Sequence, residues 1–156
     1  MQADFNILLR LVVALVLAGI LGYERERAGK AAGIRTHMLV GLGAALFVVL
    51  GELFVFRFRQ YDQNMRFDPI RIIEAVVTGI SFLGAGTIFV SRGRERVEGL
   101  TTAASIWATA AVGMTVGLER YVLAVGSTIL IFIVLRVLSF LDVIPQEEIT
   151  KETDGA

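Results

Sequence analysis

Charged residues concentrate in short polar stretches between long apolar ones, and they are the side chains whose types could do chemistry. The first such stretch alternates acid and base in Glu24-Arg25-Glu26-Arg27 and runs on to the only histidine, His37. Carboxylates and guanidinium groups form bidentate pairs, and a histidine can titrate near neutral pH. The candidate functional cluster comprises Glu24, Arg25, Glu26, Arg35, Thr36, His37, Arg92, Arg94 and Arg96.

Two interpretations of this cluster remain open at the level of sequence. In the first, Glu24 and Glu26 pair with Arg35 and with the arginines of the 91–98 stretch, forming one polar docking or gating surface. In the second, the charges are solvated independently and only set the orientation of the chain in a membrane. A lone histidine is more often a packed or capping residue than a ligand, so His37 by itself does not decide between them.

A second set of candidates combines hydroxyls and glycines. Between Gly99 and Gly117 no residue is charged, and Ser105, Thr109, Gly113 and Gly117 recur at four-residue spacing on one helical face. Such a face predicts a tightly packed central helix; the alternative is that its hydroxyls line a polar path. The glycines of the 78–87 segment offer close packing or a local helix break. The full set is Gly79, Gly84, Gly86, Thr101, Thr102, Ser105, Thr109, Gly113 and Gly117.

Several function classes find no support. The absence of cysteine removes disulfides, thiolate metal sites and thiol catalysis. No metal-ligand spacing, nucleophile elbow or acid–base pair is recognisable, so we expect no enzyme, no catalytic residue, no metal site and no cofactor. The carboxylates Glu24, Glu26, Glu52 and Glu74 lie near predicted helix ends, which argues against a magnesium path through mid-membrane. A net charge of zero indicates no nucleic-acid partner.

The apolar stretches predict an all-α, polytopic membrane protein. The 156 residues are 55% hydrophobic, and a spanning helix needs about 20 mostly apolar residues. One transmembrane domain, 1–141, accommodates five helices, with Thr36 expected to cap the second and Asp68-Pro69 to start the third. A polar tail, 142–156, is expected to be disordered. The predicted helices are 5–23, 38–56, 70–90, 100–118 and 121–141.

Two further predictions concern charges in and around these helices. Arg10, inside the first helix, is expected to snorkel to the near interface, or otherwise to point inward to a carboxylate. In the segments between and after the helices, eight Lys and Arg residues fall on one side and four on the other. By the positive-inside rule the N-terminus is therefore outside and the C-terminus cytoplasmic.

Four motifs, in order, resemble the MgtC/SapB-type bacterial inner-membrane proteins. The motifs are Gly22-Tyr23-Glu24-Arg25-Glu26-Arg27, the 32–40 segment beginning Ala-Gly-Ile-Arg-Thr-His, the 79–86 segment Gly-Ile-Ser-Phe-Leu-Gly-Ala-Gly, and 99–113 beginning Gly-Leu-Thr-Thr-Ala-Ala-Ser. The resemblance covers 5–141 and implies a five-helix membrane domain with a cytoplasmic C-terminus. Virulence-associated members carry a further soluble C-terminal domain, which this chain is expected to lack.

The resemblance also implies a link to magnesium limitation, acid stress and survival in host cells. The leading hypothesis is a multi-pass inner-membrane regulator that acts on another membrane protein, or on itself as a homo-oligomer, through helix–helix contacts in the bilayer. The alternative is a channel or carrier for an ion such as Mg²⁺ or for a small solute. A water-filled polar cavity would favour transport, and a small-residue stripe exposed to lipid would favour the regulator.

Overall fold

Five helices account for most of the chain in the computed structural model, which describes residues 2–59, 68, 70–90 and 97–141. One two-stranded antiparallel sheet joins the third helix to the fourth, with Phe89 opposite Glu98 and Val90 opposite Val97. The elements are α1 (Gln2–Arg27), α2 (Ile34–Arg59), α3 (Ile70–Ala85), β1 (Phe89–Val90), β2 (Val97–Glu98), α4 (Leu100–Gly117) and α5 (Tyr121–Leu141).

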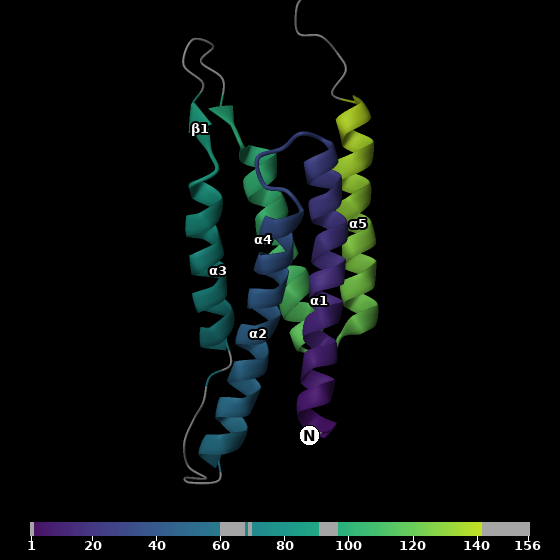
Figure 1. Ribbon diagram of the computed structural model, residues 1–156. Coiled ribbons are helices and arrows are strands. Elements are labelled where there is room, and N and C mark those ends of the chain that lie inside the picture. The colour runs from purple at the N-terminus through teal and green to yellow at the C-terminus, as the bar shows by residue number, and fades with distance from the viewer. Residues whose placement is uncertain (1, 60–67, 69, 91–96, 142–156) are drawn as a thin grey trace, which may run out of the picture.

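The helices run alternately up and down in one bundle (Figure 1). The α1–α2 connection, the β1–β2 strands and the end of α5 lie at one end of the bundle, and the N-terminus and the α4–α5 turn lie toward the other. The turn is short, as predicted, and α5 packs antiparallel to α4. The first and third connections, which carry most of the basic residues, therefore lie at the same end.

Helix α4 is the centre of the bundle, since it packs against each of the other four helices. Its buried face contains Ser105, Thr109, Gly113 and Gly117, the four residues at four-residue spacing. Both glycines face α2. A Cβ on Gly113 would overlap the Gly41 carbonyl oxygen, and one on Gly117 would lie 2.8 Å from the Val48 Cβ. The small side chains thus let the two backbones touch, which is how helices associate without a hydrophobic driving force.

Helix α3 ends at Ala85 and is therefore shorter than the predicted helix 70–90. Gly86 and Thr87 close its last turn, with the Thr87 hydroxyl donating to the Gly84 carbonyl oxygen at 2.7 Å. The following Ile88, Phe89 and Val90 favour extended backbone, since β-branched and aromatic side chains suit strands. The predicted start was correct, because the Asp68 carboxylate accepts from the Ile70 amide at 3.0 Å; Pro69 lies outside the described residues.

Helices α1 and α2 are both longer than the predicted 5–23 and 38–56. Helix α1 continues to Arg27, and α2 begins at Ile34 rather than near Thr36. The prediction that Thr36 caps α2 was wrong, because the Ile34 amide donates to the Glu26 carboxylate at 2.9 Å. The His37 amide donates to the Gly33 carbonyl oxygen, so that helical hydrogen bonding already starts there.

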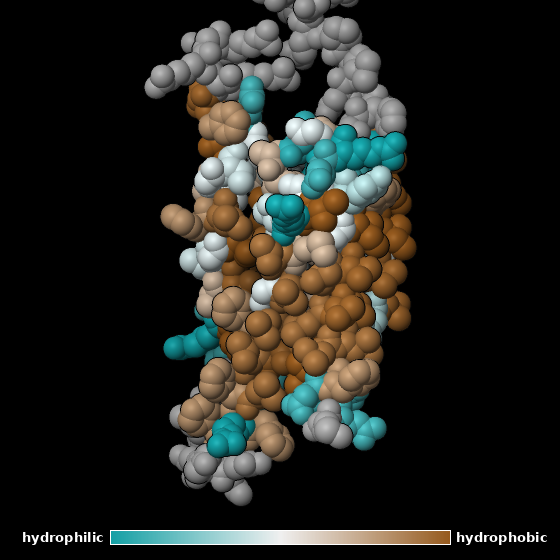
Figure 2. Space-filling model, in the orientation of Figure 1, coloured by the Kyte–Doolittle hydropathy of each residue, from teal (hydrophilic) through white to brown (hydrophobic). Residues whose placement is uncertain are grey.

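The surface of the bundle matches a membrane environment. A continuous apolar belt separates two polar ends in the face shown in Figure 2. Three helices are long and apolar enough to cross a bilayer, over Asp4–Arg27, Ile34–Phe58 and Leu100–Gly117, and the apolar part of α5 described with its side chains is slightly shorter. Large apolar side chains project outward, among them Val122 at 90% and Phe82 at 85% exposure. The protein is therefore a helical membrane protein.

Arg10 points inward and does not snorkel. Its guanidinium lies 3.0 Å from the Glu52 carboxylate of α2 and also forms an ion pair with Glu119 in the α4–α5 turn. Only 16% of the arginine side chain is exposed. Of the two alternatives for this residue, the structure therefore selects pairing with a carboxylate. These two ion pairs join α1, α2 and the α4–α5 turn at the end of the bundle away from the α1–α2 connection.

Candidate functional site

The end of α1 carries an ion pair that the bundle buries almost completely. The Glu24 and Arg25 side chains are each 2% exposed, and Arg25 Nε lies 3.0 Å from Glu24 Oε2. The N–H does not point at the oxygen well enough for a hydrogen bond, and Arg25 Nη1 also finds no hydrogen-bond partner among the described residues. A buried pair with unused donors stabilises little and costs much if one charge is removed.

His37 of α2 connects this end of α1 to the central helix. Its side chain is fully buried, with Nδ1 3.0 Å from the Gly33 carbonyl oxygen and Nε2 3.2 Å from the Ser105 hydroxyl of α4. A carbonyl oxygen only accepts, so Nδ1 carries a proton. The Ser105 hydroxyl lies 2.8 Å from the Thr102 carbonyl oxygen, to which it can donate.

The Ser105 hydroxyl can hydrogen-bond to either protonation state of the histidine. When Ser105 donates to His37 Nε2, the imidazole is neutral. When Ser105 donates to the Thr102 carbonyl oxygen, Nε2 must donate to the serine, and the imidazole is protonated on both nitrogens. Rotation of the Ser105 hydroxyl can therefore satisfy either state without moving a helix, but conversion between the states also requires that a proton enter or leave the imidazole.

Close approach of α2 to α1 creates this burial. A Cβ on Gly22 would lie 2.7 Å from the Ile34 Cα and 2.9 Å from the His37 Cβ. Only a residue without a side chain allows the start of α2 to lie so close to the last turns of α1. The charged pair lies in the turn of α1 that follows this contact, and both of its side chains are buried.

The structure gathers only part of the predicted charged cluster. Glu24 pairs with Arg25 at the end of α1, His37 of α2 contacts Ser105 of α4, and Glu26 accepts from the Ile34 amide. Arg35 is exposed and Thr36 is partly buried. Arg92, Arg94 and Arg96 lie outside the described residues, so the predicted pairing with them stays a prediction. Glu24 itself is paired with the adjacent Arg25 in a buried setting.

Three hydroxyl-bearing side chains of α4 are buried, and one is exposed. Thr102, Ser105 and Thr109 are buried, and Thr109 donates to the Ser105 carbonyl oxygen of its own helix at 2.8 Å. Thr101 is exposed and lines a surface pocket of about 710 Å³ between the α1–α2 connection and the two strands. The Ser105 and Thr109 hydroxyls hydrogen-bond to carbonyl oxygens of their own helix, which favours a packing role for this face. A polar path along these hydroxyls stays the alternative hypothesis.

The candidate glycines divide by environment. Gly113 and Gly117 contact α2 directly, and Gly84 lies in ordinary van der Waals contact with Ala103 of α4. A Cβ on Gly86 would meet only its own turn, and one on Gly79 would meet nothing within 4 Å. Gly79 and Gly86 therefore do not pack against another helix of this chain. The sequence left close packing and a local helix break open for Gly79, Gly84 and Gly86, because neither alternative follows from the local pattern alone.

The composition of the site and a comparison with known proteins narrow the class of protein to which the chain belongs. No group of three or more His, Cys, Asp or Glu side chains able to hold a metal ion occurs among the described residues. The family model described as the MgtC family matches residues 11–144, nearly the whole helical bundle. The chain belongs to the MgtC family. Relatives of the chain occur in several bacteria. No solved structure matches the chain.

Three MgtC-family relatives show how far the similarity extends. The putative magnesium transporter YhiD of Escherichia coli K12 is 42% identical over 137 residues, which are 88% of this chain and 61% of YhiD. Protein SapB of Bacillus subtilis is 31% identical over 130 residues, 83% of this chain and 55% of SapB. Protein MgtC of Brucella abortus 2308 is 42% identical over 104 residues, 67% of this chain and 39% of that protein. The chain thus spans about three fifths or less of each relative.

Proposed function

We propose that this MgtC-family protein is a regulator in the bacterial inner membrane that binds other membrane proteins through helix–helix contacts during magnesium limitation or acid stress. The observation that carries the proposal is an uncovered small-residue face on α3. Thr78, Gly79 and Ala85 are exposed on this face around the protruding Phe82, and no other helix of the described chain covers them. The small residues beside the ring leave room for the backbone of a partner helix to approach closely.

The chemistry of this face suits a lipid-exposed docking surface. The Thr78 hydroxyl donates to the Glu74 carbonyl oxygen at 2.8 Å, so it exposes no unsatisfied donor to the bilayer. Gly79 leaves open space beside the helix backbone. A face of this kind gains more from a packed helix than from mobile lipid chains, because dispersion contacts with a fixed partner are denser.

The second candidate function is a channel or carrier for Mg²⁺, another ion or a small solute. The name of the Escherichia coli relative favours it, as does the hydroxyl-rich face of α4. The closeness of α2 to Gly113 and Gly117 weighs against it, because backbone contact leaves little room for a hydrated ion. Flux of ²⁸Mg²⁺ into proteoliposomes containing the purified full chain separates the two functions.

The proposal assumes a topology with the N-terminus outside, which a labelling experiment checks. The chain has no cysteine, so single Lys30→Cys and Arg120→Cys variants report unambiguously. We expect a membrane-impermeant maleimide to label Arg120→Cys in intact spheroplasts and Lys30→Cys only after permeabilisation. Both side chains are exposed, at opposite ends of the bundle. The reverse pattern would place the N-terminus in the cytoplasm and rule out this orientation.

The docking face is tested by replacing its open glycine. A Gly79→Leu variant should keep the stability of the bundle, because nothing lies within 4 Å of the new Cβ. It should nevertheless lose growth support in low magnesium and lose the protein adducts formed by a photoreactive phenylalanine analogue at Phe82. Gly126→Leu on α5, which also meets open space, serves as the matched control. Normal growth of the Gly79→Leu strain, with lipid-only adducts at Phe82, would exclude the α3 face as a docking surface.

A further inference from the structure

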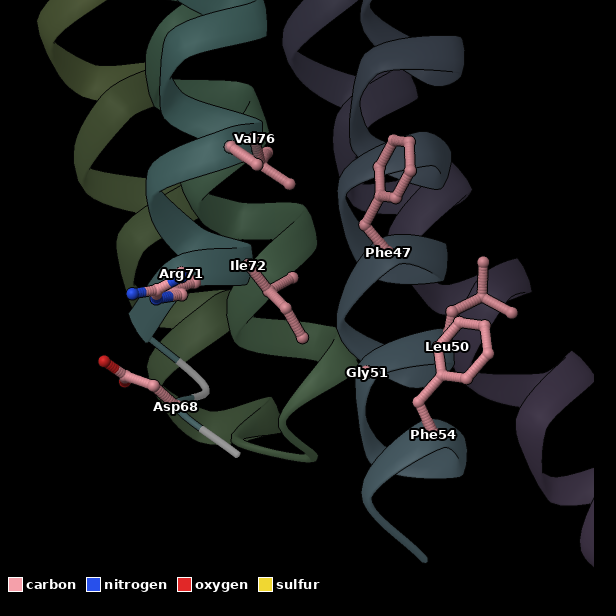
Figure 3. Close-up of a pocket in the computed structure, with 9 residues that line it drawn as sticks. Phe47, Leu50, Gly51, Phe54, Asp68, Arg71, Ile72 and Val76 are labelled. Carbon is pink, nitrogen blue, oxygen red and sulfur yellow. The ribbon is translucent and has the colours of Figure 1, made fainter. Parts of the chain in front are cut away.

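A groove separates α2 from α3 on the apolar belt. Ile72 of α3 reaches toward Gly51 of α2 and forms the floor, while Phe47, Leu50 and Phe54 line the α2 side (Figure 3). Glycine at position 51 permits this contact because it has no Cβ. A Cβ there would overlap the Ile72 side chain. The groove volume is about 990 Å³, at the upper end of the roughly 300–1,000 Å³ typical of small-molecule sites. That space and the apolar walls suit an acyl chain better than a single ion or water.

One end of the groove is charged. Asp68 and Arg71, at the start of α3, both line it, and in Figure 3 their charged ends extend in the same direction, to the side of α3 that faces away from α2. The Asp68 carboxylate caps the Ile70 amide. Arg71 is exposed, and within the described part of the chain its guanidinium forms no ion pair or hydrogen bond with another side chain. A cation and an anion thus lie together where α3 begins.

The character of the walls argues for a lipid rather than a helix in the groove. Transmembrane helices associate where small residues let the backbones approach closely, but the α2 side here presents two phenylalanine rings and a leucine. The phenylalanines are more than half exposed, at 57% for Phe47 and 53% for Phe54. A flexible acyl chain can follow such an uneven wall, whereas a second helix would be held away from the floor.

We propose that this groove binds a phosphoethanolamine lipid, with an acyl chain over Ile72 and the zwitterionic headgroup at Asp68 and Arg71. The phosphate accepts from the Arg71 guanidinium, and the ammonium group lies against the Asp68 carboxylate. A phosphoglycerol headgroup offers Arg71 the same phosphate but gives Asp68 no cation. Charge complementarity therefore selects the ethanolamine headgroup over the glycerol one.

Native mass spectrometry of the purified, delipidated full chain measures this preference. Phosphatidylethanolamine and phosphatidylglycerol with the same acyl chains are titrated in separate experiments. We expect ethanolamine lipid to bind about tenfold more tightly, the size of one charge-assisted contact. Arg71→Gln should weaken binding of both lipids about tenfold, whereas Arg120→Gln, outside the groove at the same end of the bundle, should leave both unchanged.

Two more variants separate the headgroup from the acyl chain. Asp68→Asn keeps a capping side chain for α3 and should remove the preference for ethanolamine lipid while retaining binding. Ala75→Phe fills the groove beside Ile72 and should abolish binding of either lipid. Equal affinities of the unmodified chain for the two lipids would overturn the proposal, as would Arg71→Gln binding like Arg120→Gln. A photoreactive analogue at Phe54 that yields protein adducts in place of lipid adducts would also overturn it.

Discussion

Replacing Gly113 with leucine is expected to lower the free energy of unfolding by about 3 kcal/mol, the upper part of the range for overpacked interiors. The physical reason is the contact with Gly41, where even a Cβ would overlap the carbonyl oxygen of α2. The backbone cannot yield there without separating α2 from α4, which lies at the centre of the bundle. Unfolding by SDS in mixed micelles, followed through the fluorescence of the single tryptophan, Trp107, measures the loss.

The matched control is Gly43→Leu. Gly43 lies two residues from Gly41 on the same helix, but a Cβ there meets nothing within 4 Å. Its stability should stay close to that of the unmodified protein, with a small gain because leucine is the better helix former. If Gly113→Leu accumulated in membranes and unfolded like Gly43→Leu, the α2–α4 contact would not hold the bundle together.

Removing the charge of Arg25 is expected to cost about 3–5 kcal/mol, because Arg25→Gln leaves the Glu24 carboxylate buried and unpaired. Both side chains are 2% exposed, so solvent cannot compensate the remaining charge. The Glu24→Gln, Arg25→Gln double variant should recover much of the loss, since neutral amides tolerate burial better than a lone carboxylate. The same SDS unfolding curves, compared between the single and double variants, measure the difference.

Arg27→Gln provides the control for this second experiment. Arg27 belongs to the same last turn of α1 but is exposed, so its removal should change the free energy of unfolding by no more than about 1 kcal/mol. Equal losses for Arg25→Gln and Arg27→Gln would mean that the ion pair is solvated rather than buried. A double variant as unstable as Arg25→Gln alone would mean that the arginine acts through packing and not through Glu24.

Much of the architecture follows from local sequence alone. Long uncharged apolar runs require helices in a membrane, because every backbone polar group must then be satisfied within the segment. The small residues at four-residue spacing between Gly99 and Gly117 identified the central helix, and the tight connection before Tyr121 identified its antiparallel neighbour. Asp68 marked the start of α3 through its side-chain cap. Four ordered motifs were enough to place the chain in its family.

The tertiary structure alone decided which polar residues are buried and with what they pair. Glu24 and Arg25 follow a predicted helix end, where charges are ordinarily solvated, but in the bundle both side chains are only 2% exposed. Arg10 finds its carboxylates on α2 and in the α4–α5 turn, at separations that no local pattern encodes. His37 likewise contacts Ser105, a residue far away in the sequence, only because α2 and α4 pack together. Propensity and periodicity describe one segment at a time, whereas burial and ion pairing depend on how distant segments come together in space.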